Sequence, residues 1–456
     1  MGALKFSLNR TGEKGKVSFL LQTMQTFLSM FMVLGINVVS AIALSRGLTA
    51  QDRGLYVEVM MWSNFILGLC DIGIYDATVY LWASSEQVRR RDVFSTMMLW
   101  AIFTGVIALT AVELLSMHVL KGHYTHGQTI AAHIYYISSC LGPIAAVFNG
   151  ILNAEQRFSL ANFVRVAVPA TLTATWVVLF AVHALSIVAC LYTGAVVSVA
   201  SALPFLWPLR LYIAKPGRIS GRILKTGVWY SLKGYGGSLI LNFSGNANQM
   251  ILFSALSPSA LAYFQTANSA TGVLWTVPNS IAMTTFPQMI GDDAEALHMR
   301  VCNYMRKSTM VVTGFALLLG LAEPYLIPLL FGHNYSPAIV PAILLLPNAI
   351  FGGLIVLLAN ALSSTGRTLH NTVGSAIGVG TTLLFMALTV HTWGLVGAAL
   401  AAVVGRITDL CVRYVWYHVT VHRISVLDMI PRVVDMAAVF SHLRKNSKVL
   451  VRRNLG

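Results

Sequence analysis

Hydroxyl and amide side chains, which bind sugars and water through hydrogen bonds, recur at helical spacing in the stretch YSLKGYGGSLILNFSGNANQM at 230–250. At about 100° per residue they fall within about 80° of arc on one helix face. That face holds Ser231, Tyr235, Ser238, Asn242, Asn246 and Gln249. A stretch near the N-terminus has a similar face, formed by Gln22, Thr26, Ser29, Asn37 and Ser40.

Two arrangements account for such polar faces, because hydrogen-bonding groups are costly against lipid and must meet protein or water. The faces either line a hydrated cavity or form hydrogen bonds between packed helices. Because the two stretches occupy equivalent places in an internal repeat, we favour a cavity lined by both. The glycines at 234, 236 and 237 would let the second helix bend.

Acidic residues inside apolar segments are a second group of candidate functional residues. Asp71 lies near the middle of its segment, and Asn64, Tyr75 and Thr78 share its helix face. A carboxylate at that depth is costly and indicates a proton or cation site, or a partner for a basic residue. The alternative is a buried salt bridge that sets helix packing. Asp76 points elsewhere and lies nearer the cytoplasmic end, so it is the weaker candidate.

Basic residues inside apolar segments could bind an anion. Arg165 lies beside Asn162, and a guanidinium binds phosphate oxygens in bidentate fashion, although a side chain at this depth can also snorkel. Lys233 lies nearly opposite the polar face, so it either snorkels or attracts an anionic substrate. Arg406 and Asp409, three residues apart, are expected to neutralise each other.

An enzyme or a metal centre is not expected. The outer loop HVLKGHYTHGQ contains His118, His123 and His126, but no carboxylate or cysteine joins them as a ligand. No nucleophile lies beside a base, and the longest outer loop, 117–128, is too short for a catalytic domain. We therefore expect no catalytic residue, no metal and no cofactor.

Apolar helices must position these side chains. Hydrophobic residues make up 56% of the 456 residues, charged residues only 10%, and the mean hydropathy is +0.70. Soluble domains contain about 25% charged residues, so this composition is typical of a membrane protein. About twelve segments are long enough to cross a bilayer: 17–44, 55–83, 93–117, 129–151, 158–182, 185–212, 228–254, 260–288, 308–331, 337–362, 369–390 and 393–417. The predicted fold class is an all-α integral membrane protein.

The distribution of positive charge predicts the topology. Most of the 31 Lys and Arg residues fall at the N-terminus, in alternate loops and in the tail. The exceptions are Arg46, Arg53 and Lys121 on the other side, and Arg165, Lys233, Arg406 and Arg413 within segments. Both termini are therefore predicted to be cytoplasmic. The net charge of +15 then reflects topology and attraction of the tail to anionic membrane lipid, with no nucleic-acid partner expected.

An internal repeat with an offset near 210 divides the chain into halves. LTAQDRGLY and LSPSALAYF correspond, as do LNAEQR, which ends at Arg157, and LSSTGR, which ends at Arg367. Six helices per half give both halves the same orientation, a parallel repeat typical of transporters. The expected parts are a cytoplasmic N-terminus (1–16), an N-lobe (17–212), a basic linker (213–227), a C-lobe (228–417) and a basic cytoplasmic tail (418–456).

Several segments resemble the polysaccharide transporter family of the multidrug/oligosaccharidyl-lipid/polysaccharide (MOP) exporter superfamily. They are DIGI (71–74), NQMILFSALSPSALAYF (248–264), FPQM (286–289), FGHNYSPA (331–338), LLANALSSTGR (357–367) and WGLVGAALAAVVG (393–405). The chain departs from the family at Asn248, where many members have aspartate, and at Ala262, where glycine is usual.

The resemblance implies two lobes around a V-shaped central cavity. It also implies a flippase of the bacterial cytoplasmic membrane, which moves polyprenyl-pyrophosphate-linked oligosaccharide from the inner to the outer leaflet by alternating access. A chain of twelve helices favours O-antigen or exopolysaccharide repeat units, and a lipid II flippase is the alternative within that function. A cation-coupled drug antiporter of the same superfamily is the nearest rival. A polysaccharide polymerase and glycosyltransferases of the same pathway are the implied partners.

Overall fold

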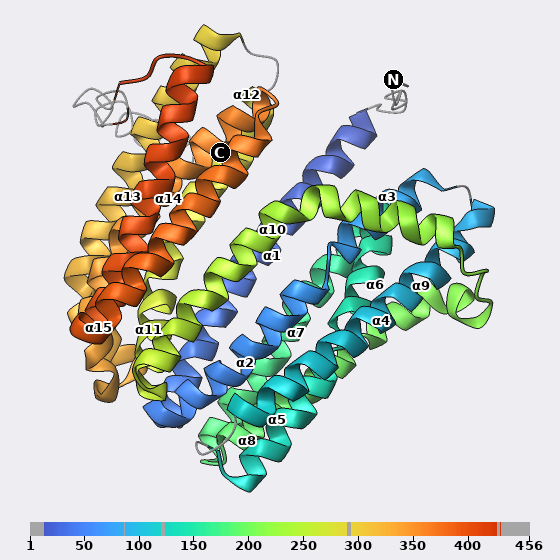
Figure 1. Cartoon of the computed structure of the whole chain (residues 1–456), viewed down its shortest axis with the longest axis horizontal. Helices are drawn as coiled ribbons and strands as arrows, with labels where there is room; N and C mark the ends of the chain where they lie inside the picture. The colour runs from blue at the N-terminus through green and yellow to red at the C-terminus, as the bar shows by residue number, and fades with distance from the viewer. Residues whose placement is uncertain (1–12, 86, 120–123, 290–292, 426–428, 430–456) are drawn as a thin grey trace, which may run out of the picture. The chain divides into compact units, whose positions relative to one another are not determined.

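The protein is built from α-helices (Figure 1). The computed structural model describes residues 13–85, 87–119, 124–289, 293–425 and residue 429, and no strand occurs in these ranges. They form two compact units, Met1–Gly236 and Gly237–Gly456. The division lies inside helix α10, Gly221–Ala255. Because α10 begins at Gly221, the second half of the expected linker 213–227 is helical. The expectation of an all-α fold is confirmed.

The helices of the first unit precede α10 in the chain. They are α1 (Glu13–Gly47), α2 (Ala50–Cys70), α3 (Ile74–Ser84), α4 (Gln87–Val119), α5 (His126–Ser139), α6 (Gly142–Ala154), α7 (Phe158–Ala181), α8 (Ile187–Ala200) and α9 (Leu203–Ala214). The helices that follow α10 are α11 (Pro258–Gly272), η1 (Val273–Trp275), α12 (Thr276–Met289), α13 (Ala294–Phe331), η2 (His333–Ala338), α14 (Ile339–Ser364) and α15 (Thr368–Thr420).

Each of the expected apolar segments coincides with a helix, part of a helix or a broken helix. By length and composition, eight helices in the described ranges can cross a membrane, or nine if α2 and α3, bent by 41°, form one span. Helix α15 counts once there, although Gly394, at φ 54° and ψ −130°, divides it into the two segments expected at 369–390 and 393–417. Helices α10, α11 and α12 are not among the eight. The polar residues of α10 explain its lower hydropathy.

The internal repeat is visible in the backbone of two equivalent junctions. Between α6 and α7, Gln156 adopts φ 58° and the amide of Arg157 donates to the carbonyl of Leu152 at 2.8 Å. Between α14 and α15, Gly366 adopts φ 79° and the amide of Arg367 donates to Leu362 at 2.8 Å. The resemblance between LNAEQR and LSSTGR therefore reflects the same turn.

The helix starts of the second repeated motif also match. Thr49 caps α2 by accepting from the amide of Asp52. Ser257 caps α11 in the same way, accepting from Ala260. Because Thr and Ser side chains satisfy amides that a helix leaves unpaired, both motifs begin a helix for the same physical reason.

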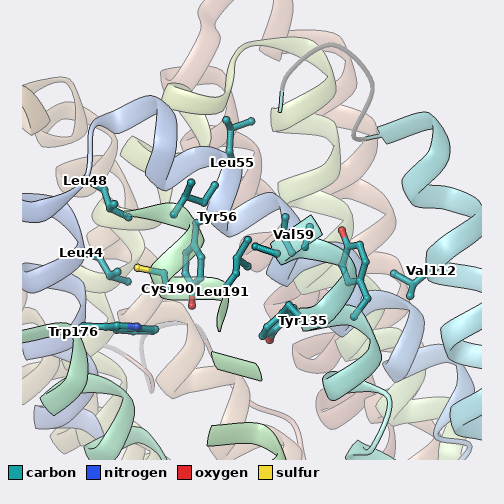
Figure 2. Close-up of a cluster of buried hydrophobic side chains, with 14 of the residues drawn as sticks. Leu44, Leu48, Leu55, Tyr56, Val59, Val112, Tyr135, Trp176, Cys190 and Leu191 are labelled. Carbon is teal, nitrogen blue, oxygen red and sulfur yellow. The ribbon is translucent and has the colours of Figure 1, made fainter. Parts of the chain in front are cut away.

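One of the core clusters of the first unit joins side chains of α1, α2, α4, α5, α7 and α8 (Figure 2). Tyr56 packs edge-on against Trp176 with ring centroids 5.9 Å apart, and the Trp176 indole N–H donates to Thr193 at 2.9 Å. Large apolar side chains also lie outside the cores: in α13, Leu317 and Leu321 are 65% and 76% exposed. Such a surface suits lipid, and the chain is a multi-pass membrane protein.

Candidate functional site

The break between α2 and α3 places the motif DIGI against helix α10. Ile72 and Gly73 have positive φ values, 40° and 68°, which end one helix and start the next. The hydroxyl of Ser231 is buried and donates to the carbonyl of Gly73 at 2.9 Å. Ser231, expected on the polar face, therefore forms a packing contact between helices.

The two acidic candidates of the first unit differ in environment. Asp71 forms the C-terminal cap of α2 and is half-buried, and its Oδ1 atom is enclosed without a hydrogen-bond partner in the described ranges. Asp76 is exposed in the first turn of α3, where a carboxylate interacts favourably with the helix dipole. Asp71 is thus the acidic candidate with an unused acceptor atom.

A pocket of about 510 Å³ in the first unit contains Arg165. The Arg165 guanidinium, carried by α7, donates to Oδ1 of Asn162 at 3.3 Å and is exposed. Asn149 and Asn153 from α6, and Tyr75 from α3, line the same pocket. A cation surrounded by neutral hydrogen-bonding groups suits an anionic or hydroxylated ligand.

A second pocket, of about 450 Å³, lies within the second unit and is rich in amide side chains. It is lined in part by Asn248 and Gln249 of α10, Gln265 and Asn268 of α11, and Asn348 of α14. The Oδ1 atoms of Asn248 and Asn348 are enclosed without a hydrogen-bond partner in the described ranges. Because enclosed amide oxygens are costly when unpaired, they are available to accept from a ligand or from water.

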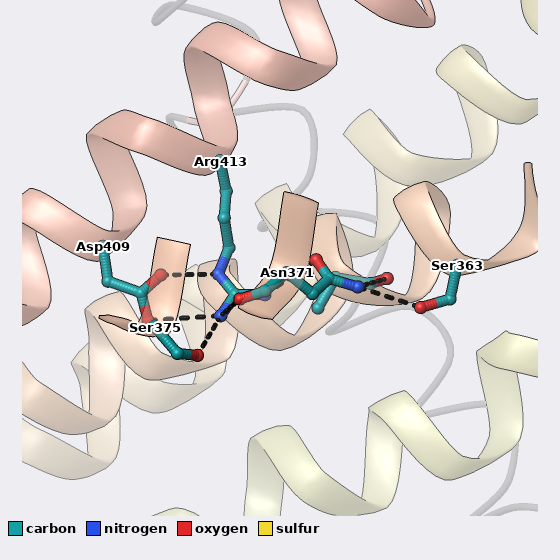
Figure 3. A network of polar contacts seen from close by, with 6 residues as sticks. Ser363, Asn371, Ser375, Asp409 and Arg413 are labelled. Atoms are coloured by element: carbon teal, nitrogen blue, oxygen red, sulfur yellow. Dashed lines mark hydrogen bonds and ion pairs between the residues drawn. The ribbon is translucent and has the colours of Figure 1, made fainter. Parts of the chain in front are cut away.

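The charges that border this pocket come from α15 and are arranged differently from the sequence expectation. Asp409 pairs with Arg413, with Nε to Oδ1 at 2.6 Å, instead of with Arg406 (Figure 3). Arg413 also donates to the side chain and carbonyl of Asn371 and to the hydroxyl of Ser375, at 2.8, 3.1 and 2.7 Å. The expectation that Arg406 and Asp409 neutralise each other was wrong because the i+4 partner takes the carboxylate.

Arg406 is held by an aromatic ring. Its guanidinium carbon lies 4.9 Å from the ring centroid of Trp275, which the short helix η1 presents. A Cβ atom added at Gly352 of α14 would overlap the Trp275 indole, so glycine at that position makes room for the ring. The guanidinium forms no hydrogen bond or ion pair within the described ranges, and its N–H groups are therefore available to a ligand.

The remaining candidates on the polar faces lie in α1 and α10. Ser29 is buried and Asn37 is exposed on α1, whereas Asn246 and Gln249 are half-buried on α10. The side chains of some candidates lie outside the described part of the structure: Gln22, Thr26, Lys233, Tyr235, Ser238 and Asn242.

Several pocket residues escaped the sequence analysis. Gln265 and Asn268 lie three residues apart on α11 and share a face, which helical spacing could have indicated. Trp275 and Asn348 are single side chains on their elements, so periodicity gave no signal for them. The pairing of Asp409 with Arg413 could have been recognised, because an acidic residue four positions before a basic one is a favourable helical pair.

These features define an all-helical membrane protein of two similar units, each with a polar pocket among its helices. Residues 43–340 match the family model described as polysaccharide biosynthesis protein, and the chain belongs to that family. The family relationship expected from the sequence is thereby confirmed. No curated protein sequence matches the chain.

The fold is shared with solved transporters. An inward-facing multidrug resistance MATE family transporter of the MOP superfamily is similar with a TM-score of 0.68 and 16% identity, over 84% of this chain and 93% of that one. The lipid II flippase MurJ, in an inward closed conformation, is similar with a TM-score of 0.70 and 13% identity, over 90% and 89%. A MOP superfamily transporter from Pyrococcus furiosus is similar with a TM-score of 0.56 and 14% identity, over 86% of this chain and 93% of that one. These likenesses confirm the twelve-helix fold with two lobes.

Proposed function

We propose that the protein is a flippase that moves polyprenyl-pyrophosphate-linked oligosaccharide repeat units across the bacterial cytoplasmic membrane for surface polysaccharide synthesis. The observation that carries this proposal is the amide-rich pocket of the second unit, in a member of a polysaccharide biosynthesis family. Amide side chains offer both donors and acceptors, which neutral sugar hydroxyls need.

The first unit supplies a complementary group. Arg165 is exposed in a pocket with Asn149 and Asn153, and its guanidinium matches the geometry of phosphate oxygens. In this proposal Arg165 binds the pyrophosphate, the amides bind the sugar, and the polyprenyl chain stays in lipid. Asp71, with its unused acceptor atom, is the proposed site for a coupling proton or cation.

The mechanism proposed is alternating access, with rocking of one lobe against the other around a central cavity. Both termini lie in the cytoplasm in this proposal, and the polymerase and glycosyltransferases of the same pathway supply and consume the cargo. Disulfide cross-links between the lobes on the outer face should then stop transport; transport that continued at its normal rate would exclude this mechanism.

Deletion of the gene in its own host tests the function. The proposal predicts loss of surface polysaccharide and accumulation of completed repeat units on polyprenyl pyrophosphate in the inner leaflet. Normal polysaccharide together with new sensitivity to cationic drugs would overturn it in favour of an antiporter.

A further inference from the structure

The pocket of the second unit contains a positive charge that forms no ion pair or hydrogen bond within the described ranges, Arg406. Its charged lining residues are Arg406 and Asp409. Both carboxylate oxygens of Asp409 face Arg413, at 2.6 Å from Nε and 3.4 Å from Nη2, so that pair is neutral as a unit. Arg406 is therefore the source of the net charge. A charge at this depth needs a counter-ion or a hydrated site.

The N–H groups of the Arg406 guanidinium have no hydrogen-bond partner in the described ranges. The Arg406 guanidinium carbon lies over the Trp275 ring, and this cation–π contact uses none of the N–H groups of the planar guanidinium as a donor to a protein acceptor. The N–H groups project from the edge of that plane, and this edge pairs with a carboxylate through two parallel hydrogen bonds. Because Gly352 leaves space for the indole, three segments, η1, α14 and α15, contribute to the contact between Trp275 and Arg406.

The other lining groups suit a sugar ring. The enclosed amide oxygens of Asn248 and Asn348 can accept from hydroxyl groups, and Gln265 and Asn268 can donate to them. The volume of about 450 Å³ is within the range of small-molecule sites, about 300–1,000 Å³. Phe264 and the face of Trp275 add apolar surface for the face of a ring.

We infer that this pocket is a subsite for a sugar that bears a carboxylate, with Arg406 pairing with the carboxylate and the surrounding amides binding the hydroxyls. The inference rests on the proposed function and deepens it by naming an acidic repeat unit as the cargo. A single guanidinium balances one carboxylate, whereas a pyrophosphate would leave the pocket with an excess of negative charge.

The residue at position 248 is a sensitive part of this arrangement. Asn248 lines the same pocket as Arg406 and contributes no charge. A carboxylate there would neutralise the guanidinium and repel an acidic sugar. Asn248→Asp should therefore remove the preference for acidic cargo, while the other amides of the pocket, on Gln265, Asn268 and Asn348, stay in place.

The test compares two synthetic lipids in liposomes that contain the purified full-length protein. Both are short-chain polyprenyl diphosphate disaccharides, and they differ only in a terminal glucuronic acid or a terminal glucose. The wild type should flip the acidic lipid at least about tenfold faster, the factor expected for one charge-assisted hydrogen-bonded pair. Arg406→Gln and Asn248→Asp should each bring the ratio near one, because each slows the acidic lipid much more than the neutral lipid.

Matched controls separate the outcomes. Arg210 stacks on Trp207 at 4.2 Å outside the pocket, so Arg210→Gln should leave the ratio unchanged. Arg406→Lys, which keeps the charge but loses the planar fork, should keep part of the preference, and size-exclusion profiles identify any variant that fails to fold.

Equal rates for both lipids with the wild type would overturn the inference but leave the flippase intact. A loss of both rates to the same degree in Arg406→Gln would assign the guanidinium to the pyrophosphate. No flipping of either lipid would reject the proposed function itself.

Discussion

Asp409 and Arg413 form an ion pair across one turn of α15, with 7% and 5% of their side chains exposed. Removing one partner of a buried pair leaves an uncompensated charge and costs about 3–5 kcal/mol, whereas removing both can be nearly neutral. Arg413→Met should therefore lower the free energy of unfolding more than the double variant Asp409→Asn/Arg413→Met. Denaturant titration in detergent measures both; a double variant that is less stable than Arg413→Met alone would contradict the pairing.

At the contact between the helix break and α10, Gly73→Ala should destabilise the protein more than Ser231→Ala. Gly73 has φ 68°, and a Cβ atom there would lie 3.2 Å from the Cβ of Ser231. Gly73→Ala should cost about 1–2 kcal/mol from the left-handed backbone alone. Ser231→Ala removes one hydrogen bond between membrane helices, worth about 0.6 kcal/mol.

Thermal unfolding of the purified protein ranks these variants. Gly314→Ala is a suitable control, since Gly314 is helical and an added Cβ would meet no atom within 4 Å. An equal loss for Gly73→Ala and Gly314→Ala would exclude strain at the break.

Substitutions in the two repeated turns should change the stability of the protein in opposite directions. Gln156 holds a positive φ without the freedom of glycine, so Gln156→Gly should relieve about 1 kcal/mol of strain. Gly366 holds the same conformation as glycine, so Gly366→Ala should destabilise by a similar amount. Stability changes of the same sign for both variants would show that the turns are not equivalent.

Arg165 should act on every cargo alike if it binds the pyrophosphate. Arg165→Gln removes a charge-assisted contact, and flipping should fall by about tenfold or more for acidic and neutral lipids together. Arg222 is exposed at the start of α10, and Arg222→Gln provides a charge-matched control. A loss restricted to one of the two lipids would move Arg165 from the pyrophosphate to the sugar.

The helices were predictable from sequence because apolar runs of membrane length carry a strong signal, and the turns at Arg157 and Arg367 were predictable because the motif repeats. The contact between Arg165 and Asn162 could also be predicted, since residues three apart on one helix are neighbours. The contact between Arg406 and Trp275 could not be predicted from the sequence, because it joins different helices and depends on space at Gly352. Periodicity reports faces within a helix and says nothing of contacts between helices.

The most direct test of the flippase itself is transport by the purified protein alone. Liposomes carrying the protein and a polyprenyl diphosphate disaccharide are treated from outside with a glycosidase that cannot cross the membrane. If the protein is a flippase, nearly all of the disaccharide becomes accessible to the glycosidase within minutes, whereas protein-free liposomes release only the outer-leaflet share. Folded protein that released no more than protein-free liposomes would contradict this function.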